Sequence, residues 1–233
     1  MDCVHERAVI SEMPYQLFVG RVAYFCWYYP VGFYKSAEPT NEVHSRGVTM
    51  WLFLSASYVY ATTLGHVCAS FTQIAESGMT FASLMFALSM LFCGVMTRPG
   101  VFPHFWIFMY RVSPFTYFIQ GTLATGLANN CMHCTDSEYI VFDAPSGSTC
   151  GQYMSNYIRQ AGGYLENEQS STQCRYCQFK TTNDYLKTIN SYWSQRWRNW
   201  GIFICYIAFN IIFAVFLYWL ARVAKGSPRK KKT

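Results

Sequence analysis

The sequence predicts an all-α integral membrane protein: about four transmembrane helices, a re-entrant helical hairpin and a disulfide-linked extracellular loop module. Two observations on composition indicate the membrane class. Apolar residues make up 52% of the 233 residues and aromatic residues 19%, whereas charged residues make up 13%, about half the share of an ordinary soluble domain. The third observation is that long apolar stretches, of a length that can cross a bilayer, alternate with polar segments.

Residues 1–126 are expected to form part of a transmembrane domain. The predicted spans are 13–34, 48–72 and 77–97. The second span is uncharged and rich in Ser, Ala and Gly, small residues that let neighbouring helices approach closely. The third contains the apolar run from Phe81 to Met96, which carries no charge. We expect the stretch from 77 to 126 to organise the rest of the chain.

The segment 101–126 is too interrupted to be a simple span. Arg111, Ser113 and Pro114 break its apolar pattern. Non-helical backbone at membrane depth is tolerated only where protein or water covers it. We therefore expect a re-entrant element that returns to the side from which it entered, and the alternative is a further span.

Two ionisable residues accompany the first and weakest span. Arg21 lies inside it, and Glu12 lies at its mouth. Ionisable groups at membrane depth are costly and usually find a partner within the bundle. The preferred interpretation is therefore structural, with Arg21 paired to an acidic neighbour or extended toward the interface. The alternative is a role for Arg21 in substrate recognition.

After residue 126 the chain becomes polar. Residues 127–198 contain five cysteines, a last apolar span follows at 199–221, and a basic tail occupies 222–233. Lys and Arg directly after a span mark the cytoplasmic side, so the C-terminus is predicted to be cytoplasmic and the cysteine-containing loop extracellular. The same reasoning explains the basic tail as a topology signal and argues against nucleic-acid binding.

Two Cys-x-x-Cys pairs in this loop have the spacing of a zinc site. The pairs are Cys131 with Cys134 and Cys174 with Cys177. Outside the cell thiols oxidise, and a loop with little core is stabilised by cross-links, so disulfides are favoured over zinc. With Cys150, the loop holds an odd number of cysteines, and one must be left over.

No catalytic pattern stands out. The sequence contains no Gly-x-x-x-x-Gly-Lys-Ser/Thr phosphate loop, no Gly-x-Ser-x-Gly elbow and no His-Glu-x-x-His motif. We therefore expect no catalytic residue, no bound metal and no cofactor in this chain.

Several long strings of residues occur in the order found in a known family. They include Phe92-Cys-Gly-Val-Met96, Phe105-Trp-Ile-Phe-Met-Tyr-Arg-Val-Ser-Pro114, Thr149-Cys-Gly-Gln-Tyr-Met154 and Arg196-Trp-Arg-Asn199. Between about residues 9 and 224, the chain resembles the C-terminal part of the second transmembrane domain of fungal pleiotropic drug resistance (PDR) transporters. These are ABC transporters of the G subfamily with membrane domains of the ABC-2 type.

The resemblance implies a multi-pass plasma-membrane component of an ATP-driven exporter of drugs, sterols or other amphipathic lipophiles. The implied substrate-pathway residues are Phe86, Ala87 and Met90. The implied outward valve consists of Gly94, Val95 and Met96. The alternative is that these residues only pack helices or face lipid. The resemblance also implies that the cross-linked cysteines are Cys134, Cys150, Cys174 and Cys177, which leaves Cys131 over.

The sequence departs from the full-length family because it shows no nucleotide-binding domain. In the full-length family those domains use ATP and Mg. We expect a truncated membrane portion whose partners are the lipid bilayer, the missing membrane and nucleotide-binding domains, and amphipathic small-molecule substrates. Such a chain is not an enzyme by itself. One alternative hypothesis is a non-transporting fragment or interaction partner of full-length relatives. Another is a membrane enzyme with zinc on the Cys-x-x-Cys pairs.

Overall fold

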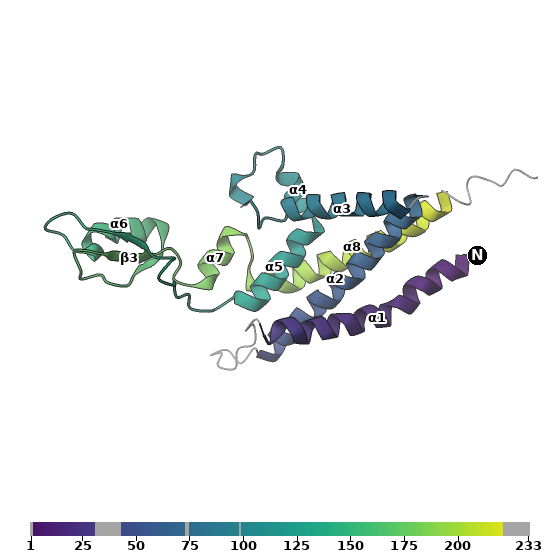
Figure 1. The fold of residues 1–233 in the computed structure, drawn as a ribbon, viewed down its shortest axis with the longest axis horizontal. Coiled ribbons are helices and arrows are strands. Elements are labelled where there is room, and N and C mark those ends of the chain that lie inside the picture. Colours follow the sequence, from purple (N-terminus) through teal and green to yellow (C-terminus); the bar gives the residue numbers. More distant parts are fainter. Residues whose placement is uncertain (1, 31–42, 73–74, 98, 221–233) are drawn as a thin grey trace, which may run out of the picture. The chain divides into compact units, whose positions relative to one another are not determined.

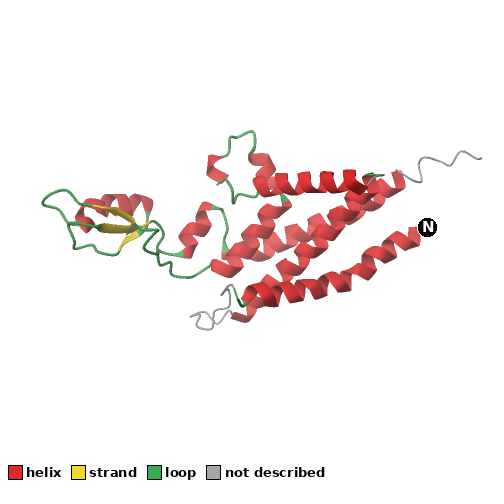
Figure 2. Cartoon of the chain, viewed as in Figure 1, coloured by secondary structure: helices red, strands yellow, loops and turns green. Residues whose placement is uncertain are grey.

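The structure, a computed structural model, divides into two compact units (Figure 1). It describes residues 2–30, 43–72, 75–97 and 99–220. The helical unit contains the residues up to 126 and those from 193 onward, and the cysteine module contains residues 127–192. Strands occur in the module, whereas the described part of the helical unit contains helices and loops (Figure 2).

The helical unit is built from long and short helices. They are α1 (Asp2–Tyr28), α2 (Val43–Phe71), α3 (Ala75–Leu91), α4 (Ile107–Val112), α5 (Pro114–Leu127) and α8 (Arg196–Tyr218), with 3-10 turns at Pro99–Val101 and Trp193–Gln195. α2 packs against α1, α3 and α8. Its buried core with α8 consists of Ala56, Tyr60, Phe203 and Ile207.

α1 and α2 run in opposite directions and approach closely. A Cβ added to Gly20 of α1 would lie 2.9 Å from the Cα of Ser55, and one added to Gly47 of α2 would lie 2.9 Å from the Tyr24 hydroxyl. A later residue of α1 therefore meets an earlier residue of α2. Such close contacts between small residues are typical of helices that pack inside a membrane.

α2 and α8 run in the same direction. Near their beginnings, the guanidinium of Arg46 lies 4.5 Å from the ring centroid of Trp193. Further along both helices, the Asn210 side-chain amide donates to the Thr63 hydroxyl at 3.4 Å. The starts of α2 and α8 consequently lie at one end of the helical unit.

By length and composition, one helix among the described residues is long and apolar enough to cross a bilayer, Trp193–Tyr218. It contains most of the predicted span 199–221. α1 begins far ahead of the predicted span 13–34 and ends at Tyr28, and α2 begins at Val43 rather than 48. Residues 31–34 of the first predicted span and the basic tail 222–233 lie outside the described residues.

The helix in the predicted span 77–97 is shorter than expected. α3 ends at Leu91, and its 17 residues reach about 25 Å at 1.5 Å per residue. Gly94 has φ +89°, a left-handed conformation that cannot continue a right-handed helix. The expectation of one helix through Met96 is therefore wrong, because the backbone turns away at Leu91.

The predicted break in 101–126 is present. α4 and α5 are separated by Ser113, which has extended backbone angles (φ −66°, ψ 121°), as expected for the residue before Pro114. The Ser113 hydroxyl donates to the backbone carbonyl of Ser89 on α3 at 3.3 Å. The chain that leaves α3 at Leu91 thus returns to α3 before α5 begins.

The cysteine module is not purely helical, which corrects the all-α expectation. Its elements are β1 (Ile140–Phe142), α6 (Cys150–Ala161), β2 (Tyr164–Leu165), β3 (Cys174–Cys177) and α7 (Thr182–Thr188). The antiparallel sheet has the order β1-β3-β2, with Val141 opposite Arg175 and Leu165 opposite Tyr176. Strands of two to four residues are too short to produce a readable alternation of apolar and polar residues.

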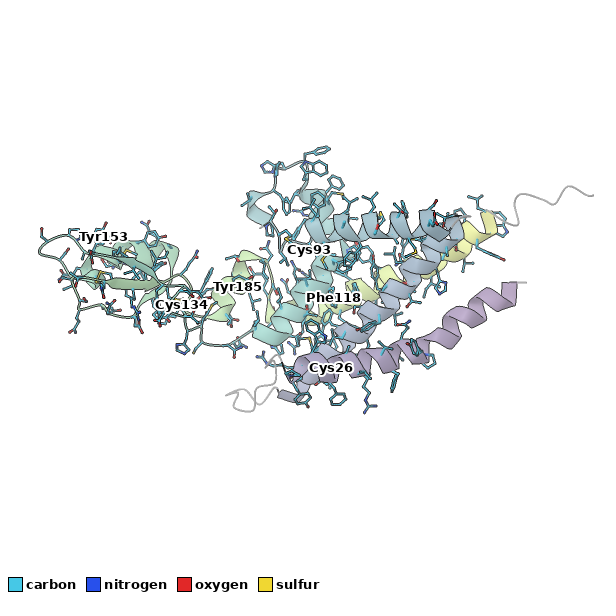
Figure 3. The ribbon with its side chains drawn as sticks, in the orientation of Figure 1. Cys26, Cys93, Phe118, Cys134, Tyr153 and Tyr185 are labelled. Carbon is cyan, nitrogen blue, oxygen red and sulfur yellow. A yellow bond between two sulfur atoms is a disulfide. The ribbon has the colours of Figure 1, made fainter. Side chains whose placement is uncertain are left out.

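Two disulfides cross-link the module, which confirms the expectation of disulfide bonds. Cys150 at the start of α6 is bonded to Cys174 on β3, and Cys134 is bonded to Cys177 at the other end of β3 (Figure 3). Each Cys-x-x-Cys pair is thereby divided, so these sulfurs do not form a zinc site. Cys131 is a free, exposed thiol.

Both helices of the module have capping boxes, in which the N-cap side chain and the third helical residue satisfy each other's backbone N–H groups. The pairs are Thr149 with Gln152 in α6 and Thr181 with Asp184 in α7. The hydrogen bond from the Thr181 hydroxyl, 2.8 Å long, and the neighbouring Lys187 lower the pKa of Asp184. The carboxylate therefore remains ionised and caps α7 at neutral pH.

Removing one disulfide is expected to loosen the module without affecting the helical unit. Replacing both Cys150 and Cys174 by Ser opens a loop with a sequence separation of 24, which costs about 3 kcal/mol of module stability in the chain-entropy model. Hydrogen–deuterium exchange of the β3 amides in the full chain measures this loss. Cys205→Ser, at an exposed free cysteine on α8, is the matched control. Unchanged β3 protection would contradict a stabilising role for this cross-link.

Candidate functional site

α3 carries the residues that the family resemblance assigns to a substrate pathway. Phe86 and Met90 lie one helical turn apart and so share a face, whereas Ala87 is rotated by about 100° from Phe86. Phe86 is 48% exposed, Ala87 is exposed and Met90 is partly buried. Exposure is general along this helix. Its exposed large apolar side chains are Met79, Phe81, Leu84, Met85, Phe86 and Leu91.

Phe86 stands at the edge of an aromatic cluster that joins the helices. Its ring meets Phe115 of α5 edge to face, with centroids 5.3 Å apart, and Phe115 meets Tyr60 of α2 in the same way at 5.9 Å. Phe118, labelled in Figure 3, lies 5.6 Å from the ring of Phe203 on α8. Phe86 on the exposed face of α3 is therefore held by ring contacts with α5, which in turn packs against α2.

The predicted valve residues lie beyond the end of α3, in a non-helical segment. Gly94 is buried, and a Cβ added there would lie 2.6 Å from the ring of Tyr110. Val95 is 52% exposed and Met96 is 76% exposed. The neighbouring Cys93 is buried and its thiol donates to the Met90 carbonyl at 2.9 Å. The structure thus presents Val95 and Met96 on a bend fixed by Gly94.

Polar residues missed by the sequence reasoning hold this bend in place. The Gln120 amide donates to the Tyr110 hydroxyl at 2.6 Å, and the Asn199 amide of α8 donates to the Gln120 carbonyl oxygen at 3.5 Å. All three side chains are buried. The sequence does contain a signal for this contact, since Gln120 and Asn199 each lie in an otherwise apolar segment. Buried amides need hydrogen-bond partners, so two such residues are expected to pair within the helical unit.

Of the two ionisable residues expected to have structural roles on α1, the structure describes the side chain of Arg21, whereas that of Glu12 lies outside the described residues. Both positions belong to the one helix α1. The interpretation of Arg21 as paired with an acidic neighbour or extended toward the interface therefore stays a prediction. Arg21 is exposed and lines a hollow between α1 and α2.

Among the described residues, no group of three or more His, Cys, Asp or Glu side chains is arranged to hold a metal ion. The chemistry available around α3 is instead that of an adaptable apolar surface. Met and Phe side chains suit such a surface, because the thioether is flexible and polarisable and the ring offers a large contact area.

Comparison with protein families identifies the chain. The model of the ABC-2 type transporter family matches residues 8–127, just over half of the chain, and the model of the CDR ABC transporter family matches residues 177–231. The chain belongs to the ABC-2 type transporter family. The first match covers α3 and the bend after it, so the candidate pathway lies within the family's membrane domain.

Full-length relatives agree with this assignment. Over 225 residues the chain is 53% identical to a pleiotropic ABC efflux transporter of multiple drugs from Saccharomyces cerevisiae. It is 50% identical to a multidrug resistance protein of Candida albicans and 45% identical to an ABC multidrug transporter of Aspergillus oryzae. These alignments cover 95–96% of this chain but 15% of each relative. The resemblance to PDR transporters is confirmed.

Gly94 provides a test of the bend after α3. Gly94→Ala is expected to lower the free energy of unfolding by about 1–2 kcal/mol, because a left-handed conformation disfavours a Cβ and Tyr110 occupies the space that it needs. Gly100→Ala is the control, since a Cβ there meets nothing within 4 Å. Thermal unfolding of both variants in detergent measures the difference. Equal stability of the two variants would mean that the bend does not require glycine.

Proposed function

We propose that this chain forms a membrane-embedded, substrate-pathway part of an ATP-driven exporter of drugs, sterols or other amphipathic lipophiles. The observation that carries the proposal is the 53% identity, along 96% of the chain, with an efflux transporter of multiple drugs. The chain spans about 15% of that relative. In this proposal, nucleotide-binding domains elsewhere in the transporter bind ATP and Mg, and the chain itself supplies no catalytic residue.

The exposed face of α3 supports the assignment of the pathway to Phe86, Ala87 and Met90. In a chain of ordinary soluble composition, so many exposed apolar side chains on one helix would indicate an interaction surface. Here the same surface would meet amphipathic substrates, and the flexible Met and aromatic Phe side chains would adapt to different shapes. The exposed Val95 and Met96 after the bend at Gly94 would close the pathway outward.

The directions of the helices support a topology of four spans with a re-entrant element. α1 and α2 run in opposite directions, and α2 and α8 run in the same direction. α3 follows α2 after a short link, and Gly78 near its start lies against Thr72, so α3 turns back along α2. α3 and α8 therefore run in opposite directions, so the chain between them must cross the membrane an even number of times. A single extra span in residues 101–126 would make α3 and α8 parallel. Residues 101–126 would accordingly re-enter rather than span.

The proposed orientation places the C-terminus in the cytoplasm and the cysteine module outside the plasma membrane. The basic residues after the last span support the first part, because Lys and Arg are enriched on the cytoplasmic side. The two disulfides support the second, because disulfides persist in oxidising compartments. With four spans, the N-terminal end of α1 also faces the cytoplasm.

A chimera tests the function. The matching segment of the Saccharomyces cerevisiae relative is replaced by this chain, and export of a fluorescent amphipathic cation is measured in cells lacking other exporters. If the chain is a functional substrate pathway, the chimera exports the dye and hydrolyses ATP. A chimera that reaches the plasma membrane and hydrolyses ATP, but does not export, would contradict the proposal.

In the same chimera, Phe86→Ala is expected to reduce export of aromatic substrates roughly two- to tenfold. That range corresponds to losing one aromatic contact of about 0.5–1.5 kcal/mol. Ile212→Ala on α8 is the matched control, because Ile212 is also a large exposed apolar residue, at 69%. Cell-surface amount and ATP hydrolysis should remain unchanged in both variants. Equal loss of export in the two would indicate that Phe86 only faces lipid.

A further inference from the structure

A hollow between α1 and α2 lies away from the candidate pathway on α3. Its volume is about 320 Å³, and its lining residues are Arg21, Tyr24, Phe25, Gly47, Val48 and Trp51. Arg21 is the charged member of this lining, and the walls are otherwise largely aromatic or aliphatic. The absence of a side chain at Gly47 leaves space beside the Tyr24 hydroxyl, which an added Cβ would approach to 2.9 Å.

The charged side chain of Arg21 distinguishes this hollow from a plain apolar groove. The guanidinium of Arg21 always carries its charge and offers a fork of N–H groups that fits phosphate oxygens. The indole N–H of Trp51 is buried and has no hydrogen-bond acceptor within the described part of the chain. Because this N–H is closed off from solvent, a ligand in the open hollow does not reach it, and the rest of the indole is what lines the hollow.

The position of the hollow suggests what the ligand is. Gly47, Val48 and Trp51 lie in the first turns of α2, and Arg21 lies about two turns before the end of α1. In the orientation of the proposed function, on which this step rests, both helix ends lie at the outer membrane surface. Lipid headgroups occupy that level, and acyl chains extend below it along apolar walls.

We propose that this hollow binds a phospholipid, with the headgroup phosphate on Arg21 and the acyl chains along Phe25 and Val48. Charge complementarity selects the phosphate, since a cation beside an apolar wall at the membrane surface is stabilised by an anion. The apolar walls select a lipid over free inorganic phosphate. The bound lipid would fill the space between the outer ends of α1 and α2.

Lipid binding by the purified full chain tests this site. Native mass spectrometry in neutral detergent follows titration with short-chain phosphatidic acid, with diacylglycerol of the same acyl chains, and with inorganic phosphate as competitor. We expect phosphatidic acid to bind at least about tenfold more tightly than diacylglycerol, because charge-assisted hydrogen bonds are lost with the phosphate. Equal binding of the two lipids, or displacement by inorganic phosphate, would overturn the proposal.

Variants locate the binding in the hollow. Arg21→Gln is expected to weaken binding about tenfold, with Arg21→Lys losing less because it retains the charge. Val48→Trp should block the hollow while retaining Arg21, since Val48 is 54% exposed. Arg111→Gln, at an exposed arginine of α4, is the matched control and should bind as the unaltered chain does. The site is excluded if Val48→Trp binds normally or if Arg111→Gln loses as much as Arg21→Gln.

This measurement is independent of transport. Loss of export in the chimera with unchanged phosphatidic acid binding would remove the proposed function and leave the lipid site. Normal export with equal binding of phosphatidic acid and diacylglycerol would remove the lipid site and leave the proposed function.

Discussion

The close packing of α2 against its neighbours holds the helical unit together. Lipid tails are as apolar as helix surfaces, so helices in a membrane associate through close contact and hydrogen bonds rather than through exclusion of water. α2 meets these needs on several sides. Gly20 of α1 lies against Ser55, Gly121 of α5 lies against the ring of Phe53, and Asn210 of α8 donates to Thr63. The organising role expected for residues 77–126 therefore belongs to α2.

The interruption between α4 and α5 is compatible with a membrane because its backbone is satisfied. Where a helix ends, its last carbonyls lose their intrahelical donors, and in lipid no water replaces them. Three successive carbonyls at the end of α4 each accept a hydrogen bond of 2.7–2.8 Å from a hydroxyl. The carbonyls are those of Tyr110, Arg111 and Val112, and the donors are Thr116, Tyr117 and Tyr206. The hydroxyl-bearing residues thus permit the break that Pro114 imposes.

Features governed by local chemistry could be predicted from the sequence, and features governed by tertiary contacts could not. Pro114 predicts the helix break because it restricts the residue before it, and apolar runs predict the helices. The end of α3 at Leu91 could not be predicted, because it depends on Gly94 approaching the ring of Tyr110 across the bend. The module's strands were also missed, because they are short and are fixed by pairing with Cys174–Cys177.

Two arginines near the same end of the helical unit show why burial alone does not indicate a ligand. Arg46 is 1% exposed, but it donates to the Thr125 carbonyl at 3.1 Å and stacks on Trp193. Its charge is thus stabilised by groups of the protein, which is the structural role that buried charges usually have. Arg21 is instead exposed and borders an open, largely apolar hollow. The inference of a bound phosphate therefore depends on Arg21 and not on the more deeply buried Arg46.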